Sequence, residues 1–231
     1  MDEQQWVWEA AEGACADEAA AHDLARRIAF LLEADKAKVI LRQSRLAHAP
    51  RRENDGEHMW HAALAALILG RYAPPGIALD KVIAMLLVHD LVEIDAGDTF
   101  IYDEEAVASQ PAREQAAAAR LFGILPPTQA QEVCALWEEF ERRESTEAQF
   151  AAALDRLLPL LLNRASGGRS WAEHGIVASQ VRERNGVVAV ASPELGEFVE
   201  HLIQGAVAAA QLPQTSDVVS SNDADAGRTS L

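Results

Sequence analysis

The sequence has little cysteine and no long apolar run. Its two cysteines, Cys15 and Cys134, lie far apart and outside any CxxC or CxxH spacing. Neither a disulfide framework nor a zinc–thiolate site is therefore indicated, and we expect a reducing compartment. No stretch approaches the roughly 20 consecutive apolar residues that cross a bilayer, and the N-terminus lacks the basic and apolar regions of a secretory signal. The sequence predicts a cytoplasmic protein with no membrane partner.

Positive charge is also scarce. The 231 residues contain 20 Lys and Arg against 36 Asp and Glu, which gives a formal net charge of −16. A field of this sign repels the phosphates of DNA and RNA, so a duplex nucleic acid is not an expected partner. A chain of this length can bury a sizeable core of its own.

Helix-forming residues dominate what is present. Ala, Leu, Glu and Arg are abundant, and apolar residues recur at spacings of three and four, which predicts an all-α fold. Residues 187–190 form the one strand-like run, too isolated for a sheet. We predict an acidic N-terminal extension over 1–16, a helical domain over 17–211 and a disordered tail over 212–231. The predicted helices span about 17–46 (with a break near 35), 55–71, 78–96, 103–122, 127–142, 146–165, 171–184 and 193–211.

The charges are unevenly distributed along the chain. Residues 82–112 contain seven acids and no Lys or Arg, and the apolar segment 82–88, typical of a buried helix, runs directly into His89 and Asp90. Charged groups that are buried in the interior need a partner, and a metal ion would be a suitable partner for these side chains. Just upstream is a basic island without acids, formed by Lys36, Lys38, Arg42, Arg45, Arg51 and Arg52.

Two further polar residues interrupt apolar helical patterns. His58 begins the helix predicted from residue 55, and Asp155 lies within the apolar segment 150–158. Either one alone is more often a hydrogen-bonded helix residue than a ligand. Together with His89 and Asp90, they offer two imidazoles and two carboxylates, which suit Mn, Fe, Co or Ni better than a closed zinc site.

This order of residues resembles the HD-domain metal-dependent phosphohydrolase superfamily, and in particular its 5′-deoxynucleotidase-like branch. The matching segments are 52–58, 87–98, 136–140 and 153–156, and the resemblance covers about residues 28–185. It implies an HD-type helical bundle, a homodimer and a divalent ion (Mn, Co, Ni, Fe or Mg). The implied metal ligands are His58, His89, Asp90 and Asp155. His61 competes on spacing alone, and we expect it to pack instead.

Glu93 and Asp98 are the candidate catalytic residues. Glu93 follows Asp90 by three positions, which places the two on one helix face. Asp98 follows Gly97, where the helix should end, and its alternative role is a cap or turn residue. The resemblance implies that both support catalysis; which of them protonates the leaving group stays open. Asp95 is expected to be a surface acid.

Arg42 is the candidate substrate-binding residue. It resembles the arginine that contacts the substrate upstream of the first His, and a guanidinium suits a phosphate; Arg45 is the alternative. Gln43 and Ser44 follow where the branch has a bulky aromatic residue, so a preference for deoxyribose over ribose stays open. Candidates for contact with a base, each expected rather in the core, are Trp60, Trp137 and Trp171.

These features predict a metal-dependent phosphomonoesterase. Its small phosphorylated substrate would be a nucleoside or deoxynucleoside 5′-monophosphate, hydrolysed to nucleoside and phosphate by metal-activated water. One alternative is an HD hydrolase of another phosphate ester: a nucleoside triphosphate, a cyclic nucleotide or a non-nucleotide. The other is a non-catalytic module that binds metal or nucleotide, against which Glu93 and Asp98 argue, because such a module needs no acid to activate water.

Overall fold

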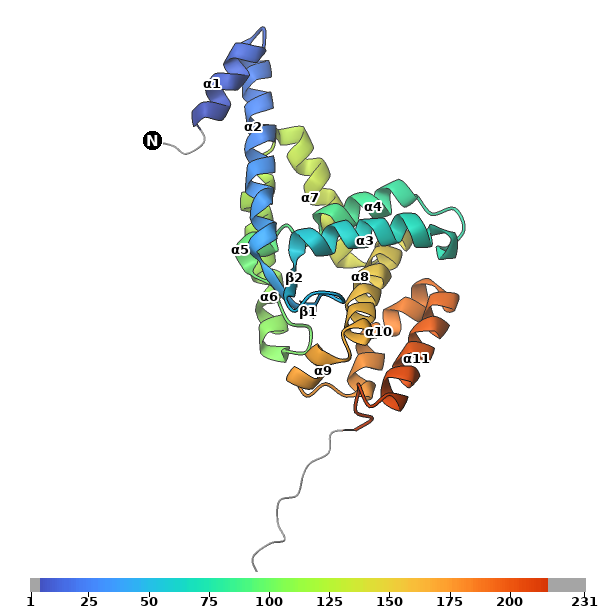
Figure 1. The fold of residues 1–231 in the computed structure, drawn as a ribbon. Coiled ribbons are helices and arrows are strands. Elements are labelled where there is room, and N and C mark those ends of the chain that lie inside the picture. Colours follow the sequence, from blue (N-terminus) through green and yellow to red (C-terminus); the bar gives the residue numbers. More distant parts are fainter. Residues whose placement is uncertain (1–4, 216–231) are drawn as a thin grey trace, which may run out of the picture.

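The structure, a computed structural model, describes residues 5–215 and confirms the all-α prediction (Figure 1). Its one sheet among these residues is a small antiparallel hairpin of β1 (Leu41–Arg45) and β2 (Arg52–Asn54). Two short 3₁₀ segments, η1 (Asp35–Val39) and η2 (Gly70–Tyr72), connect longer elements. The helices are α1 (Gln5–Ala14), α2 (Glu18–Ala34), α3 (Asp55–Leu69), α4 (Leu79–Val88), α5 (Glu93–Ala96), α6 (Glu104–Phe122), α7 (Pro127–Arg142), α8 (Thr146–Ala165), α9 (Arg169–Glu173), α10 (Ala178–Ala191) and α11 (Pro193–Ala208).

Helix α8 is the centre of the fold. Ser145 caps its first turn by accepting a hydrogen bond from the backbone N–H of Ala148. The helix is apolar around most of its circumference, as expected of a buried helix, and Phe150, Leu154 and Leu157 are all buried. It packs against α3, α4, α7 and α10, with α11 on the far side of α10 (Figure 1). Side chains that emerge from α8 therefore face the interior.

A second apolar cluster joins α6 and α7 to the segment after α4. Leu91 and Val92 belong to this cluster, whose largest members are Phe30, Phe122 and Trp137. The rings of Phe122 and Trp137 lie 6.3 Å apart. Because apolar residues on either side of it are held by packing, the turn that carries Asp90 has a fixed position between the two cores.

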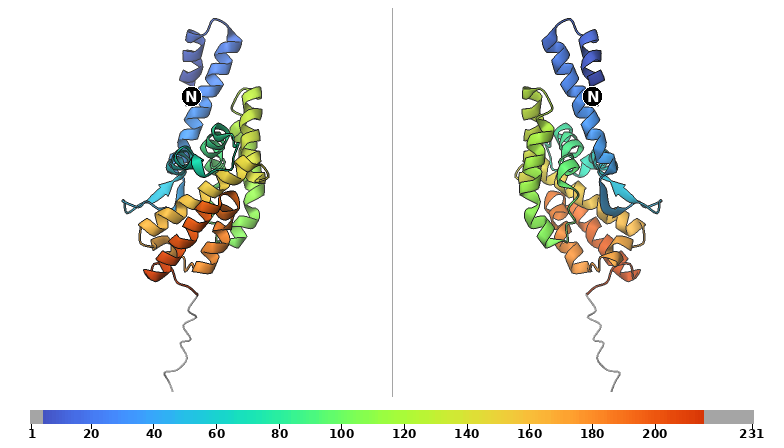
Figure 2. Two further views of the ribbon diagram at one scale, coloured as in Figure 1. Left: turned by 90° about the vertical axis from the view of Figure 1, so that its right-hand side faces the viewer. Right: turned by 90° about the vertical axis from the view of Figure 1, so that its left-hand side faces the viewer.

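The N-terminal helices form an arm. Helix α1 packs along the first half of α2 through Val7, Ala11, Ala21 and Ala25, and Figure 2 shows this pair projecting beyond the rest of the molecule. The predicted boundary at residue 16 lies in the turn between them and stays a prediction. At the other end, Leu212 is buried and the carbonyl of Pro213 accepts from the N–H of Ala178 at 2.8 Å. Residues 216–231 of the predicted tail lie outside the described residues.

Four sequence predictions about local structure were wrong. The helix predicted over 171–184 is instead two helices, α9 and α10, which residues 174–177 separate. The predicted break near residue 35 is present, since α2 ends at Ala34, but residues 41–45 form a strand rather than a further helix, because the hairpin partner 52–54 offers hydrogen bonds that periodicity does not reveal. The helix predicted over 78–96 is interrupted after Val88 by tight turns with N–H groups bonded three residues back. Residues 187–190 belong to α10 rather than to a strand-like segment. None of the described helices combines the length and the apolarity needed to cross a membrane.

The packing of α8 predicts a contrast between two leucines. Leu157→Ala should lower the free energy of unfolding by about 2–5 kcal/mol, because it opens a cavity in the core. Leu31→Ala is the matched control, since Leu31 lies on a helix but is 63% exposed; it should change stability by no more than about 0.5 kcal/mol. Urea denaturation measures both. Equal losses would contradict the central position of α8.

Candidate metal centre

His58 is positioned by the start of α3. The backbone N–H of Glu57 donates to the side-chain oxygen of Asn54 at 2.9 Å, and the N–H of Asn54 donates to the Glu57 carboxylate at 3.2 Å. This capping box fixes the first turn of the helix. The His58 side chain consequently enters the interior, where it is 0% exposed.

The other three predicted ligands meet His58 in one buried cluster. Asp155 extends from the middle of α8, while His89 and Asp90 lie in the turns between α4 and α5. Nε2 of His58 is 3.0 Å from Oδ1 of Asp155 and 3.8 Å from Oδ2 of Asp90. Nε2 of His89 is 3.2 Å from Oδ1 of Asp90 and 3.6 Å from Oδ1 of Asp155. The structure thus brings together all four residues that the sequence predicted as ligands.

Hydrogen bonding aims the histidine nitrogens at this cluster. Nδ1 of His89 lies 3.0 Å from the carbonyl oxygen of Leu86, which only accepts, so Nδ1 carries a hydrogen and Nε2 is the ring nitrogen directed at the cluster. That Nε2 is buried and has no hydrogen-bond partner within residues 5–215. Nδ1 of His58 faces Oε2 of the buried Glu53 at 3.6 Å, which orients Nε2 of His58 toward the same point.

The electrostatics of the cluster favour a cation. Burial lowers the pKa of His89, but the charges of Asp90 and Asp155 outweigh it and raise that pKa to about 10. Burial raises the pKa of Asp155, yet the charge of Arg156, the hydrogen bond with His58 and the nearby ring of His89 hold it well below its usual range. Two buried carboxylates therefore draw positive charge to this point. Two imidazole nitrogens and two carboxylates that converge here fit a divalent metal ion.

A second acidic group adjoins the cluster. Asp55, Asp90 and Glu93 have carboxylate oxygens close to one another. Burial, followed by the charge of Asp90, raises the pKa of Asp55 to about 7 and the pKa of Glu93 well above its ordinary value. Arg42 inserts among them: its Nη1 forms an ion pair with Asp90 and lies 3.4 Å from Asp55 and 3.8 Å from Glu93. The guanidinium therefore holds three acids together beside the candidate ligands.

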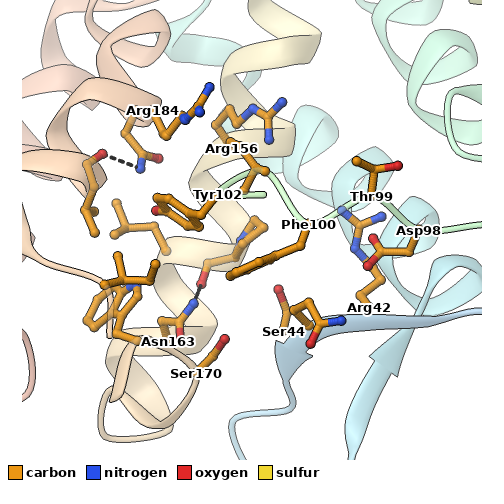
Figure 3. Close-up of a pocket in the computed structure, with 18 residues that line it drawn as sticks. Arg42, Ser44, Asp98, Thr99, Phe100, Tyr102, Arg156, Asn163, Ser170 and Arg184 are labelled. Carbon is orange, nitrogen blue, oxygen red and sulfur yellow. Dashed lines mark hydrogen bonds between the residues drawn. The ribbon is translucent and has the colours of Figure 1, made fainter. Parts of the chain in front are cut away.

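Two cavities open beside the cluster. The polar cavity, about 1310 Å³ including its mouth, is lined by His89, Asp90, Glu93 and Asp155 among others. The aromatic pocket, about 700 Å³ including its mouth, is lined by rings and apolar side chains that include Phe100, Tyr102 and Trp171 (Figure 3). Residues shared by both linings mark their junction: Arg42, Asp98, Thr99, Ile101, Arg156 and Arg184.

Asp98 reaches this junction on the loop between α5 and α6. Gly97 begins the loop with φ of 76°, a backbone conformation that favours glycine. Arg113 of α6 anchors the loop by donating to the carbonyl of Ala96 and, at 3.0 Å, to Oγ1 of Thr99. Figure 3 shows Asp98 beside Arg42, and burial raises the pKa of the Asp98 carboxyl.

Several other candidate residues lie away from the cluster. Trp60, which we expected in the core, is instead 63% exposed, and His61 stacks on it with ring centroids 6.0 Å apart. Trp137 is buried in the α6–α7 core, whereas Trp171 lines the aromatic pocket. Arg45, the alternative to Arg42, pairs with Glu173 at 2.7 Å.

Sequence reasoning missed Glu53, Asp55, Arg156 and Arg184. The two acids lie at the start of α3, where carboxylates usually sit in solvent and interact with the helix end, yet they are 1% and 0% exposed. No signal in a single sequence separates these cases. Arg156 is adjacent to Asp155, with Nε and Oδ2 3.8 Å apart, and its position next to a candidate ligand was the one available hint.

Comparisons with known proteins agree with this geometry. One protein family, described as HD domain, matches residues 34–196. The human 5′-deoxynucleotidase HDDC2 is 30% identical over 106 residues, and the Xenopus laevis protein of the same name is 33% identical over 104 residues. These matches cover 46% and 45% of this chain, and the chain spans about half the length of each relative.

A solved structure extends the likeness to most of the chain. It is described as a predicted metal-dependent phosphohydrolase from Magnetospirillum magnetotacticum and is 46% identical, with a TM-score of 0.79. The alignment covers 83% of this chain and 99% of that one. Because the family match spans residues 34–196 and therefore includes α3, the α4–α5 turn and α8, the chain belongs to the HD domain family.

Proposed function

We propose that this protein is a metal-dependent phosphohydrolase that cleaves nucleoside or deoxynucleoside 5′-monophosphates. The observation that carries the proposal is the junction of the two cavities: a cluster suited to a divalent ion opens to one side and a ring-lined pocket to the other. A nucleoside monophosphate has the same two-part character, with a doubly charged phosphate joined to an aromatic base. The likeness to 5′-deoxynucleotidases adds support.

His58, His89, Asp90 and Asp155 are the residues that would hold the ion. When bound, a divalent ion there supplies Lewis acidity toward a phosphoryl oxygen and lowers the pKa of water. Activity measured with each metal in turn determines which of Mn, Co, Ni, Fe and Mg the site uses. Glu53 would fix the orientation of the His58 ring.

Glu93 and Asp98 would accept or donate protons during hydrolysis, and Arg42 would bind the phosphate of the substrate. Glu93 is buried beside Asp90, and its Oε2 has no hydrogen-bond partner in the described part of the chain, so it is available to a water molecule or a leaving oxygen. Asp98 lines both cavities at the junction, where the ester oxygen of a bound monophosphate would lie. The fork of Arg42 suits two phosphate oxygens, and Arg156 and Arg184 add positive charge to the same junction.

Other phosphate esters fit this site less well. A non-nucleotide ester would leave the aromatic pocket without a ligand, and a purely binding module gives no reason for the buried Glu93. We also propose that the protein works as a homodimer in the cytoplasm. The exposed apolar side chains on the outer face of α3 support the dimer: Trp60, Leu64, Leu67 and Ile68.

Phosphate release with and without metal tests the ion and the substrate class together. Purified protein supplied with Mn, Co, Ni, Fe or Mg in turn should release orthophosphate from at least one nucleoside monophosphate, and a chelator should abolish the release. His58→Ala should be inactive because it removes one nitrogen of the cluster. His61→Ala, whose ring stacks on Trp60, is the control and should retain activity. A panel without phosphate release under any metal would refute the proposal.

Glu93→Gln tests the proton-transfer role. The amide is nearly isosteric but cannot exchange a proton, so kcat should fall by about 10²–10⁴-fold. Asp95→Asn, two residues away on the same short helix, is the matched control, because Asp95 pairs with Arg120 at the surface. Its kcat should stay within about twofold. Steady-state kinetics measures both variants, and a fully active Glu93→Gln enzyme would exclude the role.

Arg42→Lys separates the two candidate arginines. Lysine keeps the charge but loses the planar fork, so kcat/KM for a monophosphate should fall at least about tenfold. Arg45→Lys should leave kcat/KM nearly unchanged, because Arg45 pairs with Glu173 and lies outside both cavities. The reverse pattern would transfer phosphate binding to Arg45.

A further inference from the structure

The amide of Asn163 carries a buried, unpaired oxygen on the wall of the aromatic pocket. Its Nδ2 donates to the carbonyl oxygen of Pro159 at 3.0 Å. Because that carbonyl only accepts, the NH₂ group must face it and Oδ1 must face away. Oδ1 is buried and has no hydrogen-bond partner among residues 5–215, although the side chain lines a cavity. A buried acceptor without a donor is unfavourable, so a ligand that supplies an N–H is favoured there.

Asn163 lies at the end of the pocket remote from the candidate metal centre. Arg42 and Asp98 line both cavities, whereas Asn163 and Ser170 line the aromatic pocket but not the polar cavity. Figure 3 shows Asn163 and Ser170 on the side opposite Arg42 and Asp98, with Phe100 between the two ends. A ligand whose phosphate is held at the junction would therefore extend past Phe100 toward Asn163.

Helix α8 sets the distance between the candidate metal centre and Asn163. Asp155 and Asn163 are eight residues apart on the same helix, which corresponds to about 12 Å of helix rise. That is the length scale of an extended nucleoside monophosphate from phosphorus to the outer edge of its base. One rigid helix thus carries a candidate metal ligand at one end of the path and an unpaired acceptor at the other.

A second amide repeats the arrangement on α10. Nδ2 of Asn185 donates to the carbonyl of Val181 at 2.8 Å, and its Oδ1 is likewise buried and unpaired within the described chain. Asn185 also lines the aromatic pocket. The polar groups on this wall therefore include two amides whose orientation leaves them acceptors, among rings and apolar side chains.

We propose that Oδ1 of Asn163 accepts a hydrogen bond from the exocyclic amino group of a nucleobase, so that the site prefers cytosine and adenine to their oxo counterparts. An amino group supplies the missing donor, whereas an oxo group at the same place would set two acceptors against each other. This inference rests on the proposed function and adds a base specificity to it. If Asn163 served only to hydrogen-bond the carbonyl of Pro159, its substitution would lower stability without changing the preference among bases.

The test uses matched substrates that differ at one group. In the wild-type protein, kcat/KM should be about tenfold higher for deoxycytidine than for deoxyuridine monophosphate, and higher for deoxyadenosine than for deoxyinosine monophosphate. Asn163→Leu, which keeps the branch at Cγ but has no polar atom, should reduce both ratios to about one. Ser166→Ala is the control: it removes a hydrogen bond to the backbone carbonyl of Asn163 but lies outside the pocket lining. It should keep the ratios.

Deoxyribose 5-phosphate, which has no base, separates this inference from the proposed function. Its turnover should be equal within about twofold in wild type and Asn163→Leu. Thermal melting of each variant identifies any general loss of folding, and the ratio of two substrates on one preparation is independent of the folded fraction. Equal turnover of amino and oxo bases by the wild type, or unchanged ratios in Asn163→Leu, would overturn the inference while leaving a nucleotidase. An equal loss on deoxyribose 5-phosphate would assign Asn163 to the sugar and also overturn it.

Discussion

The constraint on which this structure depends is the burial of two carboxylates and two imidazoles at one point. Asp90 and Asp155 cannot lie there as isolated charges, because desolvation would exceed any gain from packing. Surrounding groups meet this constraint in turn: His58 and His89 face the carboxylates, Arg42 pairs with Asp90, and Arg156 lies beside Asp155. The remaining demand for positive charge, visible in the raised pKa of His89, is what a divalent ion would satisfy.

Local structure is arranged to deliver those side chains. The capping box at Asn54 begins α3 at the point that sends His58 inward. The interruption after Val88 frees the chain from regular helix, and the Leu86 carbonyl then fixes the ring of His89. Each device uses backbone hydrogen bonds that a regular helix leaves unsatisfied at its ends. The helix termini thus determine the directions of the His58 and His89 side chains, and the packed body of α8 holds Asp155 in place.

The net charge of the chain and the local arrangement of its charges lead to different expectations about an anionic partner. The chain carries −16 overall, which disfavours a polyanionic partner. Yet Arg42, Arg156 and Arg184 converge on the junction of the two cavities, close to a cluster suited to a metal ion. At such short range, a few cations in a sheltered cavity outweigh a diffuse negative surface that salt screens. A small phosphate ester is therefore compatible with a strongly acidic protein.

The sequence by itself determined the all-α class, the family resemblance and the four residues that meet at the candidate metal centre. The all-α class follows from helical periodicity, the resemblance follows from short matching segments, and the ligand set follows from polar groups at core positions together with that resemblance. Only the tertiary structure decided that Glu53 and Asp55 are buried, that Arg42 rather than Arg45 reaches the acids, and that Asn163, which lines a pocket, has a buried and unpaired oxygen. The physical reason is that burial and hydrogen-bond partners depend on residues distant in the chain. Glu53 and a capping carboxylate in solvent look alike until α3, β2 and α8 are packed together.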